Sequence, residues 1–100
     1  MADDVKLKLD EKGHGRFYIM EGETQVAEMV ISVSNDLLTV YHTEVLPRVE
    51  GKGLGKQLLA AMVDHARRNE MKVIPLCPYV HAQFKRHPEL YADVWQKADQ

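Results

Sequence analysis

The sequence predicts an α/β domain in which a mainly antiparallel sheet of about five strands is covered by one long helix and closed by a C-terminal helical segment. Three patterns in the sequence predict this fold. Residues 5–45 alternate apolar and polar side chains between short turns, as hairpin-connected strands do. From Leu54 the apolar residues recur about every four positions, which is the spacing of a helix. Residues 71–76 form a short apolar run that fits a further strand.

The first half is expected to form an antiparallel meander, because short turns join its strands. Val5–Leu9 alternates apolar and charged residues and is expected at an edge of the sheet. The four strands are expected at Val5–Leu9, Arg16–Met20, Gln25–Ser34 and Leu38–Val45. In the third strand, Ala27, Met29, Ile31 and Val33 share one face, and Val26, Glu28 and Val30 share the other.

The second half is expected to cross over the sheet and return parallel. A strand, a helix and a strand in this order favour a right-handed crossover, so Met71–Leu76 is expected parallel to the fourth strand. Pro78 suits the first position of a second helix that reaches Arg86, and Glu89–Trp95 is expected to add a final turn or two. The apolar stripe of the long helix comprises Leu54, Leu58, Leu59, Met62, Val63 and Ala66. Tyr79, Phe84, Tyr91 and Trp95 are expected in the core.

Composition excludes several classes of protein. The 100 residues allow one domain, 1–100, and 13 basic against 15 acidic residues leave a charge of −2, which weighs against nucleic acid as a partner. With 45% hydrophobic and 28% charged residues, the chain is typical of a globular protein and not of a disordered one. No apolar run approaches the roughly 20 residues of a membrane span, and the acidic start at residues 1–4 is unlike a secretory signal.

Cysteine and histidine usage points to a cytoplasmic protein without a metal. The single cysteine, Cys77, permits no internal disulfide and no all-cysteine zinc site. No close pair of histidines has metal-ligand spacing together with a third candidate ligand. A reducing compartment is therefore the expected location.

The segment Gly51-Lys52-Gly53-Leu54-Gly55 lies between the fourth strand and the long helix. Glycines permit positive φ angles and close approach of the backbone to a ligand, and a helix start offers unpaired N–H groups and a positive dipole end. Together these features favour a phosphate site. Neither the P-loop nor the Rossmann fingerprint fits, since Lys56 stands where each motif needs a glycine.

The stretch from Val45 to Gly55 resembles the signature of the GNAT superfamily of acyl-CoA-dependent acetyltransferases. That signature, Arg/Gln-x-x-Gly-x-Gly/Ala, follows a strand that usually ends in Val-x-Pro. With Pro47 as the anchor, Gly53 and Gly55 take the two glycine positions, and Glu50 stands where Arg or Gln is usual.

A shifted register, Arg48-x-x-Gly51-x-Gly53, also satisfies the signature. The first register is preferred because it keeps the Pro47 spacing and because the apolar stripe of the helix begins at Leu54.

The chain is most similar to one branch of this superfamily, the minimal single-domain GNAT-like N-acetyltransferases of about 100 residues. Four motifs occur in the order of that branch within residues 14–95, which is far more specific than one glycine loop. They read His42-Thr43-Glu44-Val45, Glu50-Gly51-Lys52-Gly53, Pro75-Leu76-Cys77-Pro78-Tyr79-Val80 and His87-Pro88-Glu89.

The resemblance implies transfer of an acetyl group from acetyl-CoA to an amine. It places the pyrophosphate of CoA on the N–H groups of the glycine loop and the pantetheine arm between splayed fourth and fifth strands, flanked by residues 43–45 and 74–77. The thioester would lie near His42 and Cys77. The cofactor-binding residues implied are Thr43, Val45, Glu50, Gly51, Lys52, Gly53, Leu54, Gly55 and Lys56.

Three residues are candidates for catalysis. Cys77 precedes Pro78 at a helix N-terminus, which stabilises a thiolate, so it is an acetyl carrier, a proton donor to the departing CoA or simply a buried apolar residue. His42 is expected in phase with Leu38, Val40 and Glu44, either half-buried and satisfied by a carbonyl or acting as a base, for which an imidazole is suited near neutral pH. Glu44 is expected to act as a base or to bind the acceptor.

Alternatives stay open at this point. The amine attacks the thioester directly, or Cys77 is acetylated first. The chain could instead be a CoA- or acyl-CoA-binding module with little or no turnover, or a structural domain that keeps its glycines for a turn. The acceptor, a small molecule or a protein amine, is not specified, and a monomer or a weak dimer through the edge strand Val5–Leu9 is expected.

Overall fold

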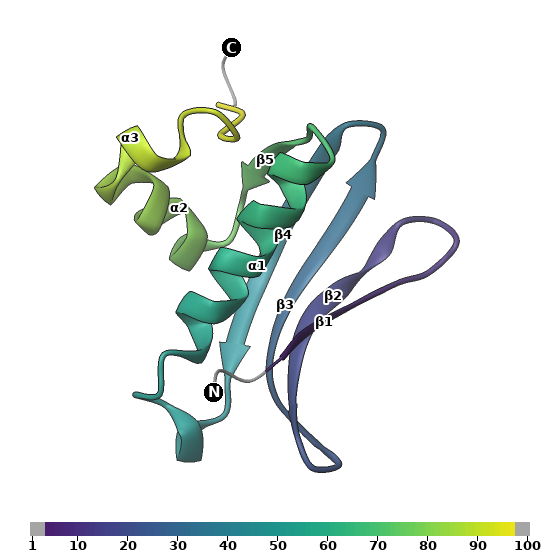
Figure 1. Ribbon diagram of the computed structural model, residues 1–100, viewed down its shortest axis with the longest axis vertical. Coiled ribbons are helices and arrows are strands. Elements are labelled where there is room, and N and C mark those ends of the chain that lie inside the picture. Colours follow the sequence, from purple (N-terminus) through teal and green to yellow (C-terminus); the bar gives the residue numbers. More distant parts are fainter. Residues whose placement is uncertain (1–3, 98–100) are drawn as a thin grey trace.

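The computed structural model describes residues 4–97, in which a five-stranded sheet carries one long helix on one face (Figure 1). Of the acidic start, residues 1–3 lie outside the described residues. The strands are β1 (Val5–Leu9), β2 (His14–Glu21), β3 (Thr24–Ser34), β4 (Leu37–Val45) and β5 (Lys72–Pro75). The helices are η1 (Pro47–Val49), α1 (Leu54–Arg68), α2 (Pro78–Arg86) and α3 (Pro88–Tyr91).

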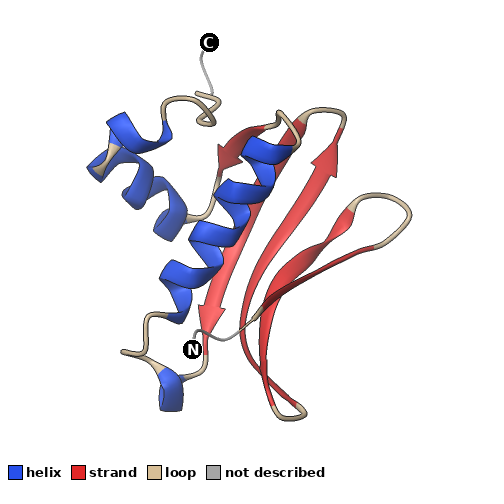
Figure 2. Cartoon of the chain, in the orientation of Figure 1, coloured by secondary structure: helices blue, strands red, loops and turns tan. Residues whose placement is uncertain are grey.

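The strands lie in chain order across the sheet. Strands β1 to β4 pair antiparallel, and β5 pairs parallel to β4 after the α1 crossover (Figure 2). The predicted meander and the predicted crossover are therefore confirmed. Strand β2 begins earlier than expected, because the Asp10 carboxylate accepts hydrogen bonds from the backbone N–H groups of Lys12 and His14 and closes a tight turn.

Helix α1 buries the face that its sequence predicts. All six residues of the predicted stripe are buried, and Leu58 and Met62 are fully so. The ring of His65 meets that of Phe17 edge to face at 5.7 Å, which places α1 on the sheet face to which Phe17 belongs. Phe17 pairs with Met29 in the sheet, so the α1 face is also the face of Ala27, Met29 and Ile31.

Val26 departs from the predicted alternation. It is buried beside Ala27, although the pattern places these neighbours on opposite faces. The register between β2 and β3 shifts here: Ile19 pairs with Ala27 and Met20 with Gln25, which leaves Val26 as the extra residue of a bulge. A bulge breaks the two-residue period locally, and a pattern read from one strand does not reveal it.

The C-terminal segment is helical for a shorter stretch than predicted. Helix α3 ends at Tyr91, and residues 94–96 then run beside β5. The N–H of Val73 donates to the carbonyl of Val94 at 2.6 Å, and the N–H of Gln96 donates to the carbonyl of Val73 at 2.9 Å. These bonds satisfy part of the outer edge of β5, which would otherwise leave backbone groups unpaired.

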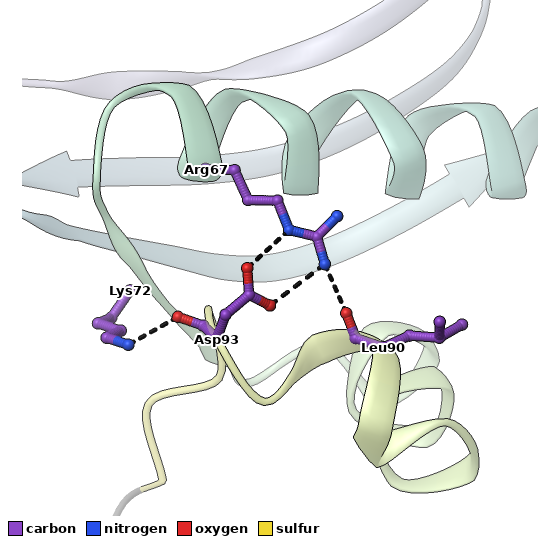
Figure 3. Close-up of polar contacts among 4 residues, drawn as sticks. All are labelled: Arg67, Lys72, Leu90 and Asp93. Atoms are coloured by element: carbon purple, nitrogen blue, oxygen red, sulfur yellow. Dashed lines mark hydrogen bonds and ion pairs between the residues drawn. The ribbon is translucent and has the colours of Figure 1, made fainter.

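Side chains from α1 and β5 hold this segment in place (Figure 3). The Arg67 guanidinium donates to both carboxylate oxygens of Asp93, at 2.8 and 3.2 Å, and to the carbonyl of Leu90. The Lys72 ammonium donates to the carbonyl of Asp93 at 2.6 Å. The hydrogen bond and charge of Arg67 lower the pKa of Asp93 below its ordinary value.

Among residues 4–97, every helix is too short or too polar to cross a bilayer.

Candidate active site

The start of α1 presents unpaired backbone donors. Gly53 is the N-cap residue, and the first helical bond runs from the N–H of Gln57 to the carbonyl of Gly53 at 3.1 Å. The N–H groups of Leu54, Gly55 and Lys56 precede that bond, and no side chain within residues 4–97 caps them. The first turn contains no acidic residue, so the positive end of the helix dipole faces the loop without a neutralising carboxylate in that turn.

Glycine is required in this loop by backbone conformation. Gly51 and Gly53 have φ angles of 91° and 78°, in the left-handed region that residues with a Cβ rarely adopt. A Cβ placed on either would meet no atom of the described part of the chain within 4 Å. The space above both residues is therefore open, and a ligand can approach the backbone closely there.

An open cleft of about 520 Å³ lies over this helix start. Eight of the nine predicted cofactor-binding residues line it; Lys52 does not. Two further lining residues are Val49 and Tyr79. The cleft thus joins the end of β4, the glycine loop and the first turn of α2.

Tyr79 was expected in the core, and it is instead partly buried with its hydroxyl at the cleft. A Cβ on Gly55 would lie 3.4 Å from that hydroxyl oxygen, so Tyr79 covers the first turn of α1. Burial raises the pKa of Tyr79 above its ordinary value. The sequence places Tyr79 at a helix start, directly after Cys77-Pro78. Whether its side chain reaches the core or the cleft depends on how α2 packs, which the sequence pattern does not reveal.

Of the charged residues in and beside the loop, Glu50 and Lys56 face the cleft, and Lys52 and Arg48 do not. Lys56 and Glu50 both line the cleft, so a cation and a carboxylate share it. Lys52 lies toward Glu21, whose pKa is lowered mainly by its hydrogen bond to Arg48 and slightly by the charge of Lys52. The Arg48 guanidinium is 2.6 Å from the Glu21 carboxylate, so it is already paired on the outer surface.

Strands β4 and β5 separate at the cleft. Their pairing runs from Leu37–Lys72 to Val40–Pro75, and beyond it the N–H of Cys77 still donates to the carbonyl of Val40 at 2.9 Å. Residues 42–45 pair with β3 on one side and have no β5 partner on the other. The predicted splay is therefore confirmed.

A bulge at Tyr41 changes which side chains face the cleft. Val40 pairs with Ile31 and His42 with Val30, so Tyr41 is an extra residue. Beyond the bulge, Thr43 and Val45 take the α1 face, because they pair with the buried Met29 and Ala27.

The prediction that His42 lies in phase with Leu38 and Val40 is therefore wrong. His42 and Glu44 project from the opposite face of the sheet, with side chains 58% and 62% exposed and with His42 Nε2 3.5 Å from Glu44 Oε1. The alternative of a half-buried, satisfied histidine is excluded as well.

Cys77 occupies the N-cap position of α2 as predicted, but its polar neighbour is not His42. Its sulfur lies 3.2 Å from the Oγ1 of Thr43, within hydrogen-bonding distance with either group as donor. The residue is 2% exposed and does not line the cleft itself. Thr43, which does line the cleft, lies beside the thiol.

Within residues 4–97, no group of three or more His, Cys, Asp or Glu side chains is placed to hold a metal ion.

Comparison with known proteins finds one matching family and several similar solved structures. A family model described as GCN5-related N-acetyl-transferase covers residues 16–94. The NMR solution structure of a GCN5-like protein from Staphylococcus aureus is similar, with a TM-score of 0.68 and 33% sequence identity over 91% of this chain and 87% of that one. A comparison with curated proteins gives no match.

Two more distant structures share the fold alone. The ribosomal-protein-S18-alanine N-acetyltransferase from Escherichia coli aligns with a TM-score of 0.63 at 18% identity, over 81% of this chain and 54% of that enzyme, so this chain spans about half its length. An aminoglycoside N-acetyltransferase in complex with CoA aligns with a TM-score of 0.52 at 17% identity, over 88% of this chain and 63% of that one.

Proposed function

Because the chain belongs to the GCN5-related N-acetyltransferase family, we propose that it binds the pyrophosphate of acetyl-CoA on residues 50–56 and transfers the acetyl group to an amine through the gap between β4 and β5. The observation that supports this most strongly is the cleft over the uncapped start of α1. An anion is the ligand that such a helix start favours.

The pyrophosphate would accept hydrogen bonds from the N–H groups of Leu54, Gly55 and Lys56, with the Lys56 ammonium adding positive charge. Glu50 opposes pyrophosphate binding, since its negatively charged carboxylate lines the same cleft. Glu50 is exposed, so water and salt screen its repulsion of the phosphates. The backbone donors and Lys56 therefore outweigh it.

The pantetheine arm would extend along β4 from the loop toward Thr43. Its two amide groups need hydrogen-bond partners when buried, and the edge of β4 that β5 has left supplies backbone donors and acceptors. Val45 supplies apolar contact along the same wall. The thioester would then lie beside Thr43 and the gap.

The amine would approach from the other face of the sheet, where His42 and Glu44 project. His42 would take the proton of the ammonium, directly or through water, and Glu44, 3.5 Å away, would orient the imidazole or stabilise its protonated form. The amine nitrogen then forms a bond to the thioester carbon, and the carbon–sulfur bond breaks. The CoA sulfur leaves as a thiolate that takes up a proton.

The covalent route requires Cys77 to attack the thioester first, giving acetyl-Cys77 and free CoA. The low exposure of Cys77 and its contact with Thr43 favour the direct route instead. In that route Cys77 remains available as a proton donor to the departing sulfur through the hydroxyl of Thr43. Trapping experiments with acetyl-CoA and no amine separate the two, because only the covalent route leaves an acetylated protein.

Calorimetric titration with CoA and acetyl-CoA tests the proposal, using Gly53→Glu and the matched control Gly22→Glu. The two glycines are matched in conformation, since Gly53 has a φ of 78° and Gly22 a φ of 63°, and a Cβ on either would lie in open space. They differ in place, because Gly22 lies in the turn between β2 and β3. We expect the parent and Gly22→Glu to bind with micromolar affinity, about 8 kcal/mol, and Gly53→Glu to lose it.

Absence of binding by the folded parent protein would contradict the proposal. Binding without consumption of acetyl-CoA over a panel of primary amines would support a CoA-binding module in its place.

A further inference from the structure

A second cavity, of about 470 Å³, lies at the outer edge of β5, between α2 and the segment that follows α3. Its walls include Pro75 and Leu76 at the end of β5, His81 and Lys85 on α2, and Trp95 and Lys97 near the end of the described chain. This volume is within the range of small-molecule sites, about 300–1,000 Å³.

This cavity is separate from the cleft over α1. The two share no lining residue, although α2 contributes to both. Tyr79 lines the cleft, whereas His81 and Lys85, one helical turn apart, line the second cavity. Val80 and Phe84 are buried on the core side of α2, so the body of the helix divides the two spaces.

The second cavity combines apolar surface with positively charged side chains. Trp95, Pro75 and the 61% exposed Leu76 present apolar surface. Lys85 and Lys97 supply positive charge, and among the lining residues that the structure describes there is no carboxylate. Within residues 4–97, neither lysine forms an ion pair.

The wall that contains Trp95 is fixed by the packing around it. The backbone bonds of residues 94 and 96 to Val73 hold it along β5, and the bidentate contact of Arg67 with Asp93 anchors the preceding turn (Figure 3). The ring of His81 meets the Trp95 ring edge to face at 6.0 Å. The Lys97 ammonium lies 4.8 Å from the centre of the same ring.

We propose that this cavity binds a small aromatic carboxylate. The apolar ring of such a ligand would pack against Trp95 and Leu76, and its carboxylate would accept hydrogen bonds from Lys85 and Lys97. A neutral analogue would gain the apolar contact alone. A phosphorylated or purely hydrophilic anion would gain the charge contact alone and would leave the Trp95 and Leu76 surface uncovered.

Trp95 is the single tryptophan of the chain, so its fluorescence reports occupancy directly. The experiment titrates the full chain with 3-phenylpropionate and, in parallel, with neutral 3-phenylpropanamide, in the presence of saturating CoA. We expect saturable quenching by the acid, and affinity for the amide that is at least about tenfold weaker because the charged hydrogen bonds are lost. Equal affinity for acid and amide, or no saturable response to the acid, would overturn the proposal.

The variant Lys85→Gln/Lys97→Gln tests the assignment of the charges. It is compared with Lys6→Gln/Lys8→Gln, which removes two lysines from β1 at the opposite edge of the sheet. We expect the first variant to weaken 3-phenylpropionate binding at least about tenfold and the second to leave it unchanged. All four lysines are exposed, so neither variant should disturb folding. Unchanged affinity in the first variant would refute the site.

Discussion

The Oγ1 of Thr43 lies 3.2 Å from the sulfur of Cys77. This contact joins β4 to the N-cap residue of α2 at the point where β4 and β5 have separated. Thr43 faces the cleft on its other side, so the thiol is linked to the proposed thioester position through one hydroxyl group. The pair therefore provides a way to test whether Cys77 takes part in transfer.

Replacement of Thr43 by Val removes the hydroxyl and keeps the shape of the side chain. If the Thr43 hydroxyl orients the thiol or relays its proton, we expect kcat to fall about tenfold, because one hydrogen bond is lost, with little change in the Kd for CoA. Thr43→Ser should restore most of kcat. Steady-state kinetics together with calorimetry measure both quantities, and an unchanged kcat in Thr43→Val would assign the contact to packing.

Replacement of His42 should separate chemistry from cofactor binding. His42 projects from the face opposite the CoA cleft, so His42→Gln should lower kcat by about two orders of magnitude and leave the affinity for CoA unchanged. His14→Gln, at an exposed histidine where β2 begins, is the matched control. Loss of CoA affinity in His42→Gln would show that the assignment of the two ligands to opposite faces is wrong.

Two alanine substitutions in the glycine loop should have opposite effects on stability. Gly53 has a φ of 78°, so Gly53→Ala is expected to cost about 1–2 kcal/mol. Gly55 lies inside α1 without a positive φ, so Gly55→Ala should stabilise by about 0.5–1 kcal/mol, provided that the Tyr79 hydroxyl, 3.4 Å from the new Cβ, keeps its place. Urea denaturation of both variants measures the difference, and equal effects would argue against the left-handed conformation of Gly53.

Acid should weaken the anchor between Arg67 and Asp93. The pKa of Asp93 is lowered in the folded protein by the hydrogen bond from Arg67, so this contact adds stability above the unfolded-state value of 3.8 and loses it as the pH falls through the folded-state value. Asp93→Asn should therefore lower the free energy of unfolding at pH 7 by about 0.5 kcal/mol, a small effect because both side chains are about half exposed. The difference between variant and parent should vanish in strong acid; a difference that persisted there would have another cause.

Truncation of a buried side chain beneath α1 should lower the free energy of unfolding far more than loss of the contact between Arg67 and Asp93. Leu58 is fully buried in the cluster between α1 and the sheet, so Leu58→Ala is expected to lower the free energy of unfolding by about 2–5 kcal/mol. Leu76→Ala is the control with the same change of side chain at a 61% exposed position, where about 0.5 kcal/mol or less is expected. Chemical denaturation compares the two, and similar losses would contradict the assigned core.

The elements and the glycine loop could be predicted from the amino-acid sequence, because each depends on residues close together in the chain. The six apolar positions of α1 recur with the helical period, and all six are buried. Cys77 stands before Pro78, and that dipeptide predicted a helix start that the structure contains. Turn residues between apolar runs predicted the meander for the same local reason.

The faces of β4 and the walls of both cavities were decided only by the tertiary structure. The bulge at Tyr41 arises from the register between β3 and β4, and no pattern within β4 marks it, so His42 was assigned to the wrong face. Tyr79 reaches the cleft, and Trp95 the second cavity, because of how α2 and the final segment pack against the sheet. Such contacts join residues distant in sequence, whereas periodicity reports only on near neighbours.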